Sequence, residues 1–266
     1  TVLEPTEYAL HRSVLRHNRA QVLAGMGRLE EALADFDTVI ELDPNYPEYY
    51  FDRATLLRRL DRHADALADY DKAIELSPPF PEVCHHRGNL WAELGEVGKA
   101  LADFDYALEL APDFLAALID RARLLCERAD PAAAWADVRA GLELDPGNAR
   151  MLCVRGSLLA EQGDIDAALR SYTEAVAADP ELVAGWANLG LLHYKTGRLE
   201  QSLIDLTEAL AHGGSAEVRY HRGVVLQALS RWDRAEQDFA QVLDVIDEPD
   251  VRVRLRECRR GVHSSA

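Results

Sequence analysis

Prolines divide the apolar runs of this chain at a constant spacing. Five of them recur at the same interval: Pro44, Pro78, Pro112, Pro146 and Pro180. Each follows a run of acidic and apolar residues such as Ile40-Glu41-Leu42-Asp43, and proline disfavours helical geometry in the residue before it. The prolines are therefore predicted to mark helix ends, and their spacing indicates an internal repeat of about 34 residues.

Small residues recur at the centre of each predicted first helix, spaced by 34 positions five times and then by 33: Ala20, Ala54, Gly88, Ala122, Gly156, Gly190 and Gly223. A second series of small residues lies in the predicted second helices: Ala32, Ala66, Ala100, Ala134, Ala168, Ser202 and Ala235. A bulkier residue follows each of these after four positions: Phe36, Tyr70, Phe104, Val138, Tyr172, Leu206 and Phe239. Two helices that cross closely need positions without a bulky side chain, so these series predict the contact between the two helices of each repeat.

Turn residues separate the two helices of most repeats. Gly27, Gly95, Gly163 and Gly197 are suited to the left-handed backbone conformation that ends a helix. The fourth repeat has Asp130-Pro131 instead, which predicts a capping side chain before a proline at the first helical position.

This succession of small residue, turn glycine, alanine, bulky residue and proline resembles the tetratricopeptide-repeat (TPR) family. The resemblance covers residues 13–249 as seven units: 13–46, 47–80, 81–114, 115–148, 149–182, 183–215 and 216–249. Residues 1–12 are expected to extend the first helix, and residues 250–266 to form a capping helix and tail. The resemblance implies an all-α fold, a right-handed α-α superhelix of seven helix-turn-helix repeats. The fourth unit departs most from the family pattern, with Val138 and Gly141 at positions where an aromatic residue and an alanine are usual.

An arginine precedes the small residue of nearly every first helix, and an aspartate usually follows sixteen positions later. The arginines are Arg19, Arg53, Arg87, Arg121, Arg155 and Arg222, and the aspartates are Asp35, Asp69, Asp103, Asp137, Asp205 and Asp238. The arginines alone could form a ladder for acidic ligands, but a helical hairpin can place positions sixteen apart opposite each other. We therefore expect partly buried pairs inside each repeat, with Arg155 and Asp205 left alone.

The resemblance places the peptide-binding surface on the concave face, which the first helices line. The N-terminal half of this face is predicted to be polar and mostly acidic: Glu48, Phe51, Asp52, Glu82, His85, His86, Asn89, Asp120 and Arg123. The C-terminal half is predicted to be more apolar: Cys153, Val154, Ser157, Asn188, Leu191, Tyr194, Tyr220 and Val224. The alternative is an ordinary solvated surface. The groove would suit an extended or helical segment with basic residues toward one end.

One subclass of the family grips a C-terminal carboxylate of chaperones with lysine, asparagine and arginine side chains. The matching places in the first three units hold other residues: His17, Gln21, Asp52, Glu82 and His86. The chain is therefore not expected to bind chaperone C-termini in this way.

The formal net charge of −17 disfavours nucleic acids and anionic membranes as partners, because both require basic patches. No stretch approaches the length of apolar residues that a membrane helix needs. The four cysteines are widely spaced and lack CxxC pairs, which favours a cytoplasmic protein.

No catalytic motif, phosphate loop or metal-ligand spacing occurs, and adjacent His85 and His86 would point in different directions on a helix. We expect no enzyme activity, cofactor or metal. The predicted function is a protein-protein interaction scaffold or adaptor that binds a peptide or partner protein. The alternative is the substrate-recognition or regulatory region of a larger enzyme.

Residues after Pro249 carry apolar positions at helical spacing, interleaved with arginines: Val251, Leu255, Cys258 and Val262. This pattern is typical of a helix that covers the apolar face of the last repeat. A basic docking segment is the alternative.

Overall fold

The computed structural model of the protein describes residues 5–76, 80–128, 130–246 and 248–265, with side chains from residue 12 to residue 261. Pro78 of the proline series lies outside these residues. Within the described ranges the chain forms fifteen helices and no strand: α1 (Pro5–Gly25), α2 (Leu29–Leu42), α3 (Pro47–Arg59), α4 (His63–Leu76), α5 (Pro81–Glu93), α6 (Val97–Leu110), α7 (Leu115–Glu127), α8 (Pro131–Leu144), α9 (Ala149–Glu161), α10 (Ile165–Ala178), α11 (Val183–Lys195), α12 (Leu199–Ala211), α13 (Ala216–Ala228), α14 (Trp232–Leu243) and α15 (Pro249–Ser265). The all-α prediction is confirmed. The chain divides into two compact units, Thr1–Leu124 and Leu125–Ala266.

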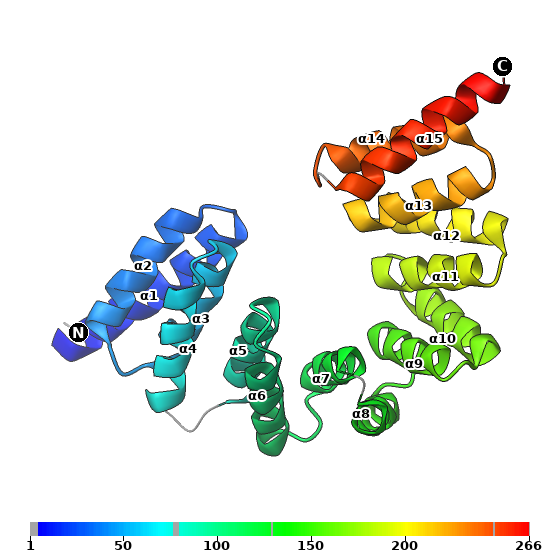
Figure 1. The fold of residues 1–266 in the computed structure, drawn as a ribbon. Helices are drawn as coiled ribbons and strands as arrows, with labels where there is room; N and C mark the ends of the chain where they lie inside the picture. Colours follow the sequence, from blue (N-terminus) through cyan, green and yellow to red (C-terminus); the bar gives the residue numbers. More distant parts are fainter. Residues whose placement is uncertain (1–4, 77–79, 129, 247, 266) are drawn as a thin grey trace. The chain divides into compact units, whose positions relative to one another are not determined.

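Helices of the first unit form hairpins that stack on one another (Figure 1). Helix α1 pairs with α2, α3 with α4, and α5 with α6. Each second helix also packs against the first helix of the next hairpin, as α2 does on α3 and α4 on α5. The first helices touch their neighbours too, since α1 contacts α3 and α3 contacts α5. Every interior hairpin is therefore covered on both sides by its neighbours.

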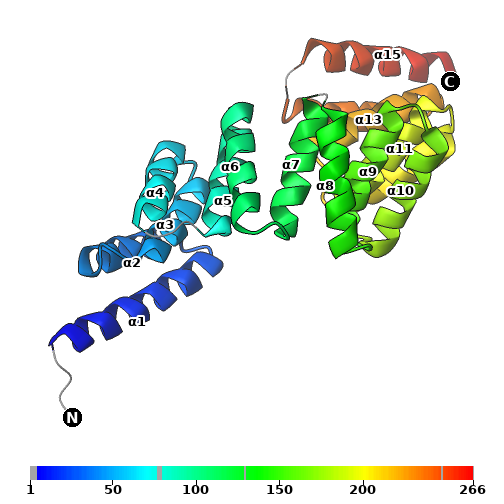
Figure 2. The same ribbon diagram turned by 90° about the horizontal axis from the view of Figure 1, so that it is seen from below.

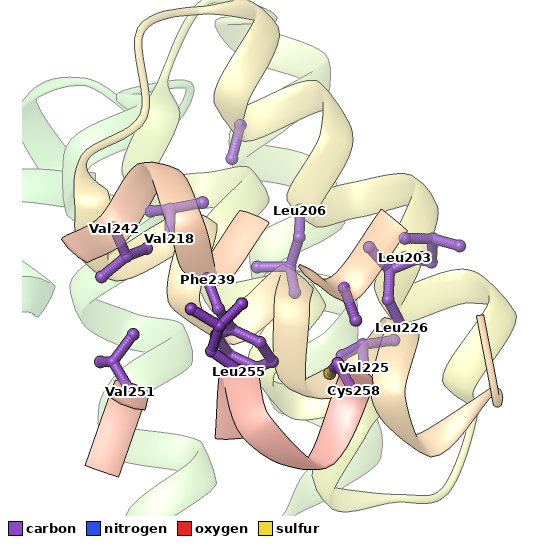
Figure 3. Packing of buried hydrophobic residues seen from close by; sticks show 12 residues of the cluster. Leu203, Leu206, Val218, Val225, Leu226, Phe239, Val242, Val251, Leu255 and Cys258 are labelled. Atoms are coloured by element: carbon purple, nitrogen blue, oxygen red, sulfur yellow. The ribbon is translucent and has the colours of Figure 1, made fainter. Parts of the chain in front are cut away.

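The second unit repeats this arrangement and ends in the predicted cap. Its hairpins are α9 with α10, α11 with α12 and α13 with α14, and α8 packs on α9. Helix α15 lies on α14 and turns Val251, Leu255 and Cys258 into the same buried cluster as Phe239 and Val225 (Figure 3). The apolar face of α15 is therefore used to close the last repeat.

The two helices of a hairpin meet where the sequence placed its small residues. A Cβ atom on Gly156 would lie 2.5 Å from the ring of Tyr172, and one on Gly190 would lie 2.6 Å from Leu206. Real Cβ atoms essentially never come this close to a neighbour, so a methyl group at either glycine would force a shift of the facing side chain. The predicted contact between the small series and the bulky series is confirmed at these positions.

The turns between paired helices use the residues that the sequence indicated. Gly27, Gly95, Gly163 and Gly197 have positive φ angles between 75° and 82°. The second and seventh hairpins achieve the same turn with Asp61 and Ser230, whose φ angles are 56° and 57°. In the fourth repeat the side chain of Asp130 accepts a hydrogen bond from the backbone N–H of Ala133 and caps α8 as predicted.

Arginine-aspartate pairs join the two helices of several hairpins. In the second hairpin Arg53 donates from Nε and from a terminal nitrogen to the two carboxylate oxygens of Asp69, both at 2.7 Å. The same bidentate pairing joins three further pairs: Arg19 with Asp35, Arg87 with Asp103, and Arg222 with Asp238. Each aspartate is buried, which confirms the predicted pairing inside these repeats, so the arginines do not form a free ladder for acidic ligands. The predicted pair of Arg121 with Asp137 joins residues of different units and stays a prediction.

A second aspartate, on the preceding hairpin, also accepts from these arginines. The remaining terminal nitrogen of Arg53 donates to Asp37 at 2.7 Å, and that of Arg87 donates to Asp71 at 2.6 Å. Arg121 donates to Asp105 in the same way at 2.7 Å. Arg53 and Arg87 therefore tie their hairpins to the hairpin before, and Arg121 ties α7 to α6. Asp37, Asp71 and Asp105 recur with the same period as the prolines. This pattern is visible in the sequence, but our predicted pairs did not include these aspartates.

The prediction that Arg155 and Asp205 stand alone is wrong. Arg155 donates to Ser171 at 2.9 Å and forms an ion pair with Glu174, one helical turn further on. Arg139 occupies the place that a bridging aspartate takes in earlier repeats, so Arg155 turns to acceptors within its own hairpin. Asp205 lies 2.6 Å from His193 Nδ1, and burial raises the pKa of its carboxyl group. His193 replaces the missing arginine because it stands one turn after Leu189 on the same helix face.

The close helix contact predicts opposite effects for two glycine substitutions. Gly156→Ala should lower the free energy of unfolding by about 1–3 kcal/mol, because its methyl group meets the Tyr172 ring. Gly98→Ala places the same methyl group in open space on an exposed helix face. It should raise the free energy of unfolding by up to about 1 kcal/mol, because alanine has a higher helix propensity than glycine. Urea unfolding followed by circular dichroism measures both. Equal effects of the two substitutions would contradict the proposed contact.

The bridging arginines predict a second stability effect. Arg87→Ala should lower the free energy of unfolding, because it leaves buried Asp103 without its bidentate donor. We expect a loss of about 2 kcal/mol, between the values typical of exposed and of fully buried ion pairs, because this pair is partly buried. Arg62→Ala, which removes an exposed pair with Asp65, is the matched control and should have little effect. Thermal melts of both variants test this, and an Arg87→Ala melt that coincides with the wild type would refute the role.

Candidate functional site

The predicted binding face of the first unit is formed by side chains of α1, α3, α5 and the part of α7 up to Leu124. Contacts across this face join residues that are 35 positions apart, one more than the repeat. We call this surface the first-helix face. Three such contacts follow one another along it: His17 with Asp52, Phe51 with His86, and His85 with Asp120.

The first contact is a polar cluster at the α1–α3 junction. Nε2 of His17 lies 2.6 Å from Asp52 Oδ2, and the side-chain amide of Gln21 donates to the same oxygen at 2.9 Å. The His17 ring also packs on Tyr49, with the ring centroids 4.9 Å apart. Asp52 therefore has two partners within the chain, and its side chain is partly exposed.

The third contact repeats this chemistry in a buried setting at the α5–α7 junction. Nε2 of His85 lies 2.8 Å from Asp120 Oδ2, and the amide of Asn89 is within 3.1 Å of His85 and 3.4 Å of Asp120. His85 and Asp120 are both buried. Two of the residues predicted for the groove are therefore placed inside the junction of neighbouring helices, where they position the helices and are not at the surface.

Between these polar clusters lies an aromatic contact. The ring of Phe51 meets His86 edge to face with the centroids 5.0 Å apart, and it meets Phe80 at 5.3 Å. Nδ1 of His86 is buried without a hydrogen-bond partner among the described residues. Burial, reinforced by the nearby His85, lowers the pKa of His86 to about 4. His86 is therefore neutral at pH 7 and serves as an aromatic surface.

The accessible part of the first-helix face is acidic. Glu48 and Glu82 are exposed at the start of α3 and α5, and Asn89 is half-buried. Arg123, on α7, is the exposed cation among the predicted residues. Sequence reasoning missed a further contact on this surface, the ion pair of Arg58 with Glu93, whose spacing of 35 is the signal that could have revealed it.

The predicted residues of the second unit lie on α9, α11 and α13. Asn188 and Leu191 are half-buried, and Tyr194 is exposed. Ser157 lies 3.0 Å from the hydroxyl of Tyr172, which ties the face to the hairpin core.

Tyr220 is engaged by the capping helix. Its hydroxyl donates to Asp250 at 2.5 Å and accepts from Nε of Arg254 at 2.9 Å, and the Arg254 guanidinium stands 5.6 Å from the ring centroid. Tyr220 and Arg254 are one repeat length apart, so α15 stands where the first helix of a following repeat would stand. The face formed by α13 is therefore partly covered by the chain itself.

The surface offers hydrogen bonds, aromatic contact and negative charge. Among the described residues no three side chains of histidine, cysteine, aspartate or glutamate are grouped to hold a metal ion. Burial raises the thiol pKa of Cys84 to about 11 and that of Cys153 to about 12, so both thiols are protonated at pH 7. None of the helices described is both long and apolar enough to cross a membrane.

The lowered pKa of His86 predicts a pH-dependent stability. Above pH 6.5 the residue is neutral in both states, while between pH 6.5 and 4 the unfolded chain takes up the proton first and the folded state loses stability. Wild type should lose about 1–2 kcal/mol more than His86→Gln on acidification over this window, a figure reduced for partial exposure. Urea titrations at pH 7 and pH 4.5 measure the difference. His212→Gln, at an exposed histidine, serves as the control. If His86→Gln had the same stability as the wild type at both pH values, the lowered pKa of His86 would be contradicted.

Comparison with known proteins agrees with this architecture. Models described as tetratricopeptide repeat match residues 17–80 and 81–114, and a model described as TPR repeat matches residues 156–197. Together they cover more than half of the chain. None of the curated protein sequences matches significantly.

Several solved structures share the fold at low sequence identity. A tetratricopeptide-repeat protein from Parabacteroides merdae has a TM-score of 0.77 and 19% identity, over 94% of this chain and 99% of that chain. A chain of the APC/C hetero-tetramer Cut9-Hcn1 has a TM-score of 0.77 and 15% identity, over 94% of this chain and 48% of that chain. YrrB, described as a TPR protein with an unusual peptide-binding site, has a TM-score of 0.56 and 22% identity, over 73% of this chain and 98% of that chain.

The paired helices, the turn residues, the small-to-bulky contacts and the matching repeat models all lead to one assignment. The chain belongs to the tetratricopeptide-repeat family.

Proposed function

We propose that the protein is a non-catalytic interaction scaffold that binds a peptide or partner protein through its first-helix faces. The observation that carries the proposal is the pair of exposed glutamates, with a half-buried asparagine, on neighbouring first helices of the first unit. Glu48 and Glu82 occupy the same position of consecutive repeats, so a partner could meet them in succession. The His-Asp and aromatic contacts beneath them hold the helices in place, which limits the entropy lost on binding.

The charge of this surface favours a partner segment with basic residues. The exposed glutamates add to a net charge of −17, which speeds the approach of cationic partners. Half-buried Asn89 adds an amide that can bond to a backbone of any sequence. In the second unit exposed Tyr194 and half-buried Leu191 offer apolar contact beside Asn188.

The similar structures support binding by analogy of fold. YrrB is described as having a peptide-binding site, and Cut9 is described in an assembly with Hcn1. These descriptions concern those proteins. For this chain they favour a polypeptide ligand over a small molecule.

Charge reversal tests the acidic surface. The double variant Glu48→Lys/Glu82→Lys should reduce the recovery of partner proteins severalfold, because it reverses the charge of two exposed carboxylates at the same position of consecutive repeats. Asp52 and Asp120 are less suitable for this purpose, since they hold His17 and His85 and their loss would disturb the fold. Affinity capture with quantitative mass spectrometry measures the recovery.

The matched control is Glu41→Lys/Glu109→Lys, which makes the same change of net charge on exposed positions of second helices. It should leave the recovered set of proteins unchanged. Equal recovery with both double variants would remove the first-helix face from the proposed function.

A further inference from the structure

A groove in the second unit combines apolar and cationic side chains, and it lies outside the first-helix face. It is formed by α8 and α9, and its volume is about 550 Å³. Helix α8 packs on α9 and α9 on α10 (Figure 2). A volume of this size is typical of ligand-binding pockets. We call it the fourth-repeat groove, and its lining residues are Trp135, Val138, Arg139, Leu142, Glu143 and Arg155.

The same place in the first unit, three repeats earlier, holds a smaller groove with different chemistry. That groove includes Leu33 and Asp37 and has a volume of about 300 Å³. Leucine stands at the position of Trp135 in five other repeats, and aspartate stands at the position of Arg139 in the three preceding repeats. Val138 stands where five of the other repeats carry an aromatic residue. The fourth repeat therefore has a larger groove, in which a tryptophan and an arginine replace a leucine and an aspartate.

The two arginines of the groove have N–H donors that no described side chain accepts. Nε and one terminal nitrogen of Arg155 are bound within its own hairpin. The remaining terminal nitrogen, which in Arg53 donates to Asp37, forms no hydrogen bond within the described part of the chain. Arg139 is exposed and has no ion pair with any described residue, including Glu143 one turn away on the same helix. The groove therefore presents unpaired donors beside an apolar surface.

We propose that the fourth-repeat groove binds a short extended segment of a partner protein in which acidic residues adjoin a large apolar residue. A carboxylate of the segment takes the place of the missing aspartate and accepts from Arg139 and from the remaining nitrogen of Arg155. The apolar side chain packs on Trp135 and Leu142. These two residues are about 10 Å apart along the axis of α8, which is the length of about three extended residues.

The place of the groove in the array and the charge of the chain favour a separate partner as the occupant. The groove is not at an open end of the stack, because α9 and α10 follow α8 and α11 packs on α10. A further repeat of the same chain would extend the stack at an end and would leave this groove open. A second copy carries the same net charge of −17, so two copies repel each other. A short segment brings only a few carboxylates, which find the unpaired donors of Arg139 and Arg155.

Titration of the native protein with labelled peptides tests the proposal. The probes are fluorescein-labelled peptides of about eight residues in which two aspartates precede a leucine, phenylalanine or tryptophan. Fluorescence anisotropy should show saturable binding of at least one probe, and replacement of both aspartates by asparagine should weaken it by about tenfold or more. The chain has four tryptophans, and the NMR signal of the Trp135 indole N–H should shift when the probe binds.

Two substitutions give the groove residues that other repeats carry at the same positions, so both variants are expected to fold. Arg139→Asp should weaken probe binding by about tenfold or more, because it removes one donor and provides Arg155 with an acceptor of its own. The new acceptor should keep the free energy of unfolding at least as high as in the wild type, which urea unfolding checks. Trp135→Leu should weaken binding by about fivefold, because it reduces the apolar contact.

Arg234→Asp is the matched control, because it makes the same change of charge at an exposed arginine of another second helix, α14. It should bind the probe like the wild type. Equal loss with Arg234→Asp, or a shift of other indole signals without one at Trp135, would overturn the proposal.

No saturation of any probe up to about 1 mM would also overturn it, whether the groove binds nothing or another segment of the native protein already fills it. A wild-type dimer by sedimentation that Arg139→Asp converts to monomer would do the same, since the occupant would then be a second copy. Glu48→Lys/Glu82→Lys should leave probe binding unchanged, because both glutamates lie outside the fourth-repeat groove. Failure of this proposal is therefore distinguishable from failure of the proposal for the first-helix face.

Discussion

Burial of each first helix against the second helix of the preceding hairpin is the interaction on which the other features of the structure depend. A single hairpin closes its internal contact, as Gly156 and Tyr172 show, but leaves an apolar side that only a neighbour can cover. Leu124 against Phe104 is one instance of that cover. Because the same contact recurs at every step, small residues, turns and ion pairs recur with it.

Polar side chains reinforce this stacking where the apolar contact ends. Arg53 and Arg87 each bind one aspartate of their own hairpin and one of the preceding hairpin. His17 and His85 join neighbouring first helices through Asp52 and Asp120. These groups supply directional contacts that fix how far one hairpin is turned against the next. Many of the charges that sequence inspection would assign to a ligand are therefore already occupied, and the exposed glutamates beside them are the better candidates for recognition.

The first and the last of the described helices differ in how their apolar side chains are covered. At the C-terminal end α15 takes the place of a following first helix, and Val251, Leu255 and Cys258 cover the last hairpin (Figure 3). At α1 the corresponding side chains Leu15 and Val22 face solvent.

By itself the sequence determined the helices, their pairing, the turns and the capping helix, because each depends on residues close together in the chain or on the period of the repeat. It also determined the pairing of Arg53 with Asp69 and its counterparts, since a hairpin with a short turn brings positions sixteen apart together. Tertiary structure decided the contacts between hairpins, such as His85 with Asp120 and Arg87 with Asp71. These contacts depend on the tilt of one hairpin against the next. On the first helices this tilt brings together residues that are one position further apart than the repeat length. It also buries residues that a helical projection would place at the surface. Tertiary structure also decided the partners of Arg155 and Asp205, because a side chain one turn away could reach them only once the helices were packed.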